Sequence, residues 1–147
     1  MNRNERKYKI LVINPGSTST AIAVYEDEKE IFFKTVRHKT NELKKYENIF
    51  EQNSFRENVI FQILAEKGID IKEFNAIVGR GGVLSPLQSG TYRINKIMLD
   101  ELRDRPRIEH ASNLGAKIAY DLANKINVPS FIVDPVAVDE MEPIARI

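Results

Sequence analysis

The chain contains 147 residues, of which 42% are hydrophobic, so it can bury one sizeable core and is expected to form a single domain. Lysine and arginine (22) nearly balance aspartate and glutamate (21), which argues against binding nucleic acid or an anionic membrane through overall charge. The absence of cysteine excludes disulfides and thiolate metal sites. No apolar run approaches the roughly 20 residues of a membrane span and no signal-peptide pattern follows Met1, so we expect a cytoplasmic protein.

Three strands are predicted at the start of the chain. Residues 8–14 (YKILVIN) form a nearly continuous apolar run that ends at Asn-Pro-Gly, which is typical of a central strand buried on both faces. Residues 20–26 and 31–38 are also strand-like, and the charged segment 27–30 between them suits a tight turn. The three strands should form a meander.

Helices and strands alternate in the rest of the chain. A helix is predicted from Asn53 or Ser54 to Gly68, because its apolar residues fall on one stripe. A short buried strand follows at 76–79, then helices at 96–103 and 113–127, and a last strand at 130–133. The order of elements predicts a mixed α/β layer fold.

A hydroxyl-rich loop, residues 14–20 (NPGSTST), joins the first two predicted strands. Gly16 permits close approach of the backbone, and the hydroxyls and N–H groups can donate to phosphate oxygens. The loop lacks both the Gly-Lys-Ser/Thr ending of a Walker A motif and the glycine spacing of a dinucleotide fingerprint. An ordinary hairpin turn is the alternative interpretation.

Three further side chains are candidates for a binding site. Arg80 ends a buried strand between glycines and could bind carboxylate or phosphate. His110 precedes a predicted helix start, where an anion is favoured. Asp134 follows the last strand, where a carboxylate commonly orients Mg²⁺ or its waters. Each also has a structural interpretation, namely a surface arginine, a structural histidine (as we expect for His38) and a turn aspartate. Together they are parts expected of a phosphoryl-transfer site.

Four segments in order, INPGSTSTAIAVYEDE, VGRGGVLSPLQSGTYRIN, HASNLGAKIAYDLA and FIVDPVAVDEMEPIARI, span nearly the whole chain. In these segments the chain resembles the first half of butyrate kinases, which belong with acetate and propionate kinases in the actin, sugar kinase and Hsp70 superfamily. The resemblance implies a ribonuclease-H-like lobe of an enzyme that transfers phosphate reversibly from ATP to a short-chain carboxylate such as butyrate. It also implies self-association into a homo-oligomer.

The same resemblance assigns roles to the candidate residues. It implies that Arg80 contacts the substrate carboxylate or the γ-phosphate, that His110 contacts the transferring group, and that Asp134 lies in the Mg²⁺ region, acting through water. It also implies that Asn14, Ser17 and Ser19 contact the ATP phosphates, and the composition of the loop adds Gly16 and Thr18 to the expected nucleotide-binding residues.

Two departures from the family pattern affect these expectations. The family motif NPGSTST continues with lysine, whereas this chain has Ala21, so charge stabilisation is expected to be weaker. The family also needs a second lobe, which the length leaves out, so we expect residues 1–147 to be one N-terminal lobe (about 1–140, then the start of an interlobe segment) that is inactive alone.

Two other functions remain open from the sequence. The first is a non-catalytic one-lobe protein that binds a ligand or a partner chain. The second is an enzyme of the same superfamily with another acceptor, such as a sugar kinase. The walls of an acyl pocket, for which Val83, Leu84 and Pro86 are candidates, cannot be assigned from the sequence.

Overall fold

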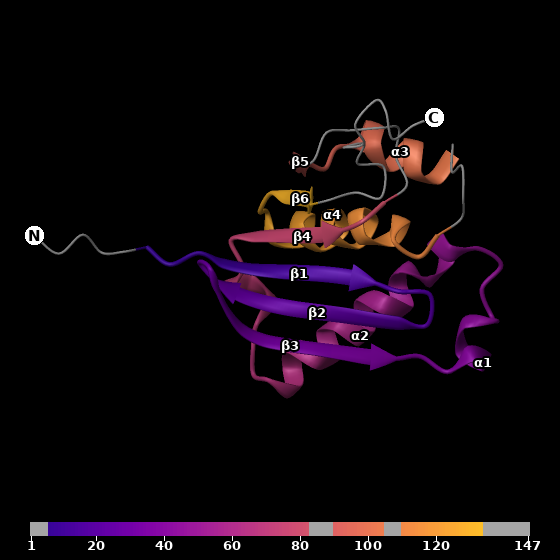
Figure 1. The fold of residues 1–147 in the computed structure, drawn as a ribbon, viewed down its shortest axis with the longest axis horizontal. Helices are drawn as coiled ribbons and strands as arrows, with labels where there is room; N and C mark the ends of the chain where they lie inside the picture. The colour runs from indigo at the N-terminus through magenta and orange to yellow at the C-terminus, as the bar shows by residue number, and fades with distance from the viewer. Residues whose placement is uncertain (1–5, 83–89, 105–109, 134–147) are drawn as a thin grey trace, which may run out of the picture.

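The computed structural model describes residues 6–82, 90–104 and 110–133, which contain a six-stranded sheet (Figure 1). The strand order is β3-β2-β1-β4-β6-β5. The central strand β1 pairs antiparallel with β2 and parallel with β4. The strands are β1 (Lys9–Pro15), β2 (Ser19–Glu26), β3 (Lys29–Arg37), β4 (Ala76–Arg80), β5 (Thr91–Arg93) and β6 (Ser130–Val133). The predicted meander is therefore confirmed as β1-β2-β3.

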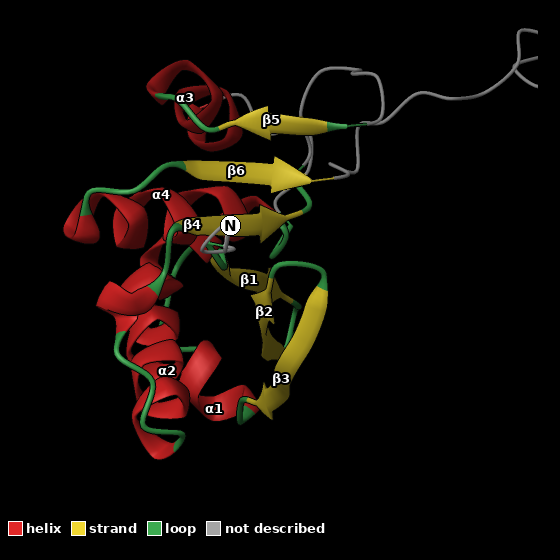
Figure 2. Ribbon diagram, turned by 90° about the vertical axis from the view of Figure 1, so that its left-hand side faces the viewer, coloured by secondary structure: helices red, strands yellow, loops and turns green. Residues whose placement is uncertain are grey.

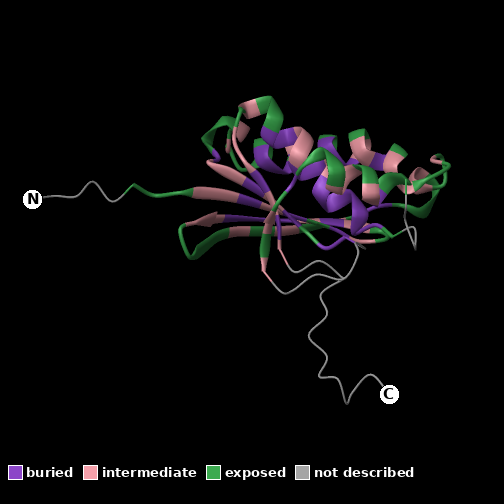
Figure 3. Cartoon of the chain, turned by 90° about the horizontal axis from the view of Figure 1, so that it is seen from above, coloured by how far each residue is buried: buried purple, intermediate pink, exposed green. Residues whose placement is uncertain are grey.

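Two long helices, α2 (Asn53–Glu66) and α4 (Asn113–Ile126), cover one face of the sheet, as the views in Figures 2 and 3 show. The shorter helix α3 (Lys96–Asp104) follows β5, and α1 (Thr40–Leu43) follows β3. Two 3₁₀ turns, η1 (Ile49–Gln52) and η2 (Ile71–Glu73), precede α2 and β4. Within the described ranges, no helix combines the length and the apolar content needed to cross a membrane.

The hydrophobic core lies between the sheet and these two helices. Leu11 and Ile13 of β1 are fully buried there, while the alternate residues Ile10 and Val12 face the other side of the sheet and are only partly buried. The prediction that this strand is buried on both faces is thus wrong for the described part of the chain, since helices cover one face only. The core side chains of α4 include Leu114, Ile118 and Leu122, at the predicted four-residue spacing.

Helix α4 lies unusually close to β4 because glycines face each other at their contact. A Cβ placed on Gly79 would lie 2.3 Å from the carbonyl oxygen of Gly115, and one on Gly115 would lie 2.7 Å from the carbonyl oxygen of Arg80. Gly81 has φ +90°, and a Cβ there would lie 2.7 Å from the Cβ of Ser112. Backbone contact at these positions fixes the end of β4 against the start of α4.

We expect Gly79→Ala to destabilise the fold, because the added methyl group meets backbone atoms that cannot rotate away. Overpacking of this kind costs about 1–3 kcal/mol. The free energy of unfolding, measured by urea denaturation, should fall by that amount. As a control, Gln62→Ala on the exposed side of α2 should change it by less than about 0.5 kcal/mol. Equal stability of the two variants would contradict the close packing.

Candidate active site

The loop predicted to bind phosphate is the connection between β1 and β2. The Gly16 N–H donates to the Ser19 carbonyl (2.8 Å), and the Thr18 carbonyl accepts from the His38 N–H (2.7 Å). Within the described part of the chain, the N–H groups of Ser17 and Thr18 have no hydrogen-bond partner, and both residues are exposed. Both N–H groups are therefore available as donors, and their binding of an anion stays a prediction.

Gly16 has a local steric role in this loop. A Cβ at this position would lie 2.7 Å from the Ser19 hydroxyl oxygen. The Ser19 hydroxyl therefore occupies the space that a side chain at position 16 would need. Asn14 is an exposed residue near the end of β1, and it lies opposite Ala21 of β2 in the strand register. The hydroxyls and N–H groups thus gather at the carboxyl end of the central strand.

Ser17 and His110 line the same pocket, although 93 positions separate them in the sequence. The pocket has a volume of about 260 Å³, and its other walls include Tyr46, Asn48 and Gln52. It joins the loop after β1 to the segment that leads into α4. The structure therefore brings together two residues that the sequence could only name separately.

The hydrogen bonds of His110 determine which of its ring nitrogens can donate to a ligand. Its Nδ1 accepts from the backbone N–H of Ser112 (3.1 Å) and lies 2.7 Å from the Ser112 hydroxyl oxygen. Because a backbone N–H can only donate, Nδ1 carries no proton, and the neutral ring holds its proton on Nε2. Nε2 has no partner among the described residues, so it can donate to a ligand.

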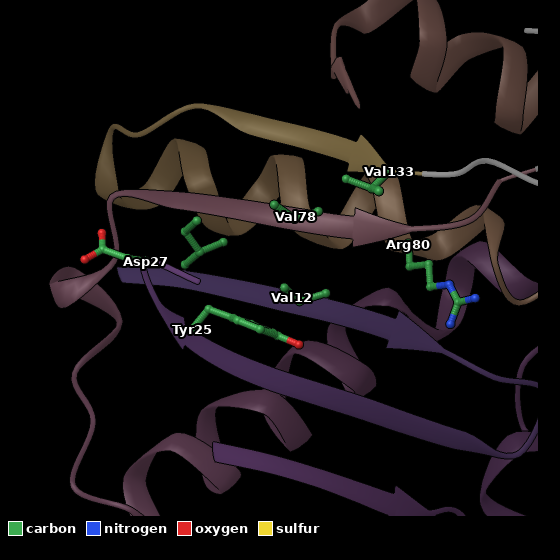
Figure 4. A pocket seen from close by; sticks show the side chains of 7 residues that line it. Val12, Tyr25, Asp27, Val78, Arg80 and Val133 are labelled. Atoms are coloured by element: carbon green, nitrogen blue, oxygen red, sulfur yellow. The ribbon is translucent and has the colours of Figure 1, made fainter. Parts of the chain in front are cut away.

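Arg80 ends β4 and is exposed, and its side chain forms neither a hydrogen bond nor an ion pair with the described part of the chain. It borders a different cavity of about 350 Å³ on the uncovered sheet face, together with Val12, Val78 and Val133. Figure 4 shows Arg80 at one end of this cavity and Asp27 at the other. Arg80 is one strand away from the Ser17–His110 pocket but does not line it.

Asp134 lies outside the described residues, as do Val83, Leu84 and Pro86. The strand register places Val133, its neighbour in sequence, directly opposite Arg80. Within residues 6–82, 90–104 and 110–133, no three histidine or acidic side chains come close enough together to hold a metal ion. The role of Asp134 near Mg²⁺ remains a prediction.

The sequence did not identify Arg56, which lies under the phosphate loop. Its guanidinium is completely buried and donates to the Ser19 carbonyl (2.7 Å) and the Ser17 carbonyl (3.4 Å). The sequence does hold one sign of this burial: Arg56 lies one helical turn before Ile60, on the core side of α2. Arginine is mostly exposed in proteins, so this position alone does not predict a buried guanidinium.

His38 belongs to the same buried cluster. Its Nε2 lies 2.8 Å from the Thr20 hydroxyl oxygen, which also accepts from Arg56 (3.3 Å). The ring packs edge-to-face against Phe55, with centroids 5.0 Å apart. His38 thus has the structural role expected of it, within a polar cluster that the sequence did not reveal.

Comparison with curated proteins gives clear relatives. The chain is 54% identical over 140 residues to butyrate kinase 1 of Clostridium acetobutylicum, a match that covers 95% of this chain and 39% of that protein. A probable butyrate kinase of Clostridium botulinum (strain Eklund 17B / Type B) is 53% identical over the same shares. The chain is a homologue of butyrate kinases. It spans about two fifths of the length of these relatives, and no family model matches it.

Solved structures with the same fold include carboxylate kinases. Acetate kinase from Entamoeba histolytica aligns with a TM-score of 0.55 at 14% identity, over 88% of this chain and 35% of that one. A propionate kinase from Francisella tularensis gives a TM-score of 0.52 at 18% identity, over 88% and 37% of the two chains. The predicted actin-like, ribonuclease-H-like fold class is confirmed.

Position 21 differs from the family pattern: this chain has Ala21, whereas the resemblance leads us to expect lysine. It alternates along β2 with the buried residues Thr20 and Ile22, so it lies on the uncovered face of the sheet, opposite Asn14. A lysine there would extend from the same face as Arg80. The consequence of its absence for activity stays a prediction.

We expect the stability of the chain to fall as the pH drops below about 6.5, the ordinary pKa of histidine. Burial lowers the pKa of His38, Arg56 lowers it further, and Glu42 opposes these effects. The unfolded chain therefore takes up the proton first, and stability is lost from pH 6.5 down to the folded-state pKa. Urea denaturation of wild type and His38→Gln between pH 7.5 and 5 tests this, since the variant should lose less stability over that range. Equal slopes would contradict it.

Proposed function

We propose that this chain is the N-terminal lobe of a butyrate kinase, which transfers phosphate reversibly from ATP to the carboxylate of a short-chain fatty acid. Homology to butyrate kinases supports the reaction class. The observation that carries the proposal is the pocket shared by Ser17 and His110. It combines free N–H and hydroxyl donors on one side with a histidine N–H on the other.

Each group in this arrangement suits one part of the transfer. The N–H groups of Ser17 and Thr18 and the hydroxyl of Ser19 would hold the ATP phosphates. The Nε2–H of His110 would donate to an oxygen of the γ-phosphoryl group as charge develops on it. Arg80, which has no protein partner in the described part, would bind the carboxylate or the γ-phosphate.

The reaction needs no general base. A short-chain carboxylic acid resembles the side chains of aspartate and glutamate, with a pKa near 4, and is ionised at neutral pH. One carboxylate oxygen attacks the γ-phosphorus, the bond from phosphorus to the bridging oxygen breaks, and ADP leaves with that electron pair. Catalysis then consists of in-line positioning and of charge neutralisation by donors on the protein and by the Mg²⁺ that arrives with ATP.

The isolated chain should turn over poorly under this proposal. The family resemblance assigns the adenosine pocket and a second arginine to the other lobe. ATP held only through its phosphates would keep few of its contacts. The proposal therefore concerns the full-length protein, with residues 6–133 contributing the donors described above.

We predict that Arg80→Ala in the full-length protein lowers kcat by about 100-fold, the size expected for losing a group that stabilises transition-state charge. Raising the butyrate concentration should not restore turnover. His110→Asn, which lacks a donor at the Nε2 position, should lower kcat by a similar factor. Acyl phosphate formed from butyrate and ATP, trapped with hydroxylamine, provides the measurement.

Arg103→Ala is the control, because this exposed arginine of α3 forms its ion pairs, within the described ranges, with acidic side chains that are also exposed. Its kinetics should equal those of the wild type. A wild-type protein that phosphorylates hexoses but not short-chain acids would replace the proposal with the sugar kinase alternative. Unchanged kcat in both site variants would remove these residues from the mechanism.

A non-catalytic role in binding a partner chain is the second candidate, and the uncovered sheet face favours it. Phe33 and Ile31 of the edge strand β3 expose 59% and 42% of their surface. Such apolar exposure is typical of a surface that another protein unit covers. If this candidate holds, sedimentation velocity should show association that rises with concentration and is lost in Phe33→Glu, together with no acyl phosphate formation by the full-length protein.

A further inference from the structure

A buried cation lies directly beneath the loop proposed to bind phosphate. Arg56 has no exposed surface, and burial lowers its pKa to about 10, so it remains charged at neutral pH. Among the described residues, its hydrogen bonds go to neutral oxygens only, those of Gln52, Ser17, Ser19 and Thr20. A buried arginine without a carboxylate is costly unless its charge has another use.

The contacts of Arg56 determine which way the loop peptides face. In a trans peptide, the C=O and the following N–H point in opposite directions. The Ser17 carbonyl points inward to Nη2 of Arg56, so the Thr18 N–H points outward, where no described residue pairs with it. The Ser19 carbonyl accepts from both Arg56 and the Gly16 N–H, which anchors the other end of the loop.

Gln52 extends the same arrangement to the pocket. Its Oε1 accepts from Nε (3.1 Å) and Nη2 (2.9 Å) of Arg56, which orients the side chain. Gln52 also lines the pocket that contains Ser17 and His110. The guanidinium therefore lies one residue behind the pocket wall, where the surrounding protein screens its charge less than water would.

We propose that Arg56 is the positioning residue of the phosphate site: it holds the peptide between Ser17 and Thr18 with its N–H outward and places an unneutralised positive charge behind the loop. This inference rests on the proposed function, because it assumes that the loop binds the phosphates of ATP. The charge also occupies the interior side of the loop, whereas a lysine at position 21 would approach from the uncovered face of the sheet. Arg56 thus supplies part of the stabilisation that Ala21 cannot.

The test uses the full-length protein with Arg56→Gln and Arg56→Lys. In Arg56→Gln, the KM for ATP should rise by about tenfold or more, the scale of one lost charged contact, while the KM for butyrate changes by less than about twofold. Arg56→Lys keeps the charge but cannot reach both carbonyls, so its KM for ATP should rise by about threefold, between wild type and Arg56→Gln.

Ile60→Val is the matched control, because Ile60 is fully buried one turn further along α2 and does not touch the loop. It should lower the thermal midpoint while leaving both KM values unchanged. An ATP KM that rises equally in Ile60→Val would show that Arg56 acts only through stability, and the proposal would be overturned. If Arg56→Gln does not fold, Arg56→Lys decides, and an unchanged ATP KM in that variant also overturns the proposal.

Failure of the underlying function gives a different result. If wild type forms no acyl phosphate, or if Ser17→Ala leaves the KM for ATP unchanged, the loop is not a nucleotide site. If wild type is active and Ser17→Ala weakens ATP binding while the Arg56 variants do not, only the role of Arg56 is rejected.

Discussion

The contact between the backbones of β4 and α4 is the constraint on which the candidate site depends. Gly79 and Gly115 allow a distance that no side chain would permit, and Gly81 continues the contact onto Ser112. As a result, the strand end that carries Arg80 and the helix start next to His110 are held by main-chain atoms. The glycines on either side of Arg80 thus have a packing role.

The opposite side of the site is organised from within the core. In the loop after β1, the Ser17 and Ser19 carbonyls accept from the buried Arg56 and the Thr18 N–H is turned outward, which is an arrangement suited to anions. A polar cluster of Arg56, Gln52, Thr20 and His38 maintains it, at a point where the neighbouring core is otherwise apolar. The two halves of the site are therefore held in place differently. Backbone contact holds the ends of β4 and α4, and a buried hydrogen-bond network holds the loop after β1.

Local sequence signals predicted most of the fold. Apolar runs identified five strands, and the stripe on 53–68 identified α2. The strand β5 was missed because three residues, Thr91–Arg93, are too few to show a period, and α1 was missed for the same reason. The loop donors were predictable because they are adjacent in sequence. Their meeting with His110 depends on how α4 packs against the sheet, which no short motif contains. Arg56 was missed because a charged residue is taken as exposed by default.

The meander also has a consequence for the order in which the site can form. Strands β1, β2 and β3 pair with their neighbours in the chain, so the strand pairings and backbone hydrogen bonds on either side of the loop lie within the first 38 residues. The parallel pairings of β1 with β4 and of β4 with β6 join segments about 50 to 70 positions apart, and such pairings form more slowly. During synthesis, the hairpin can therefore fold before the helix that carries Arg56 has been made. The hairpin would form first, and Arg56 would then fix the orientation of the peptide between Ser17 and Thr18.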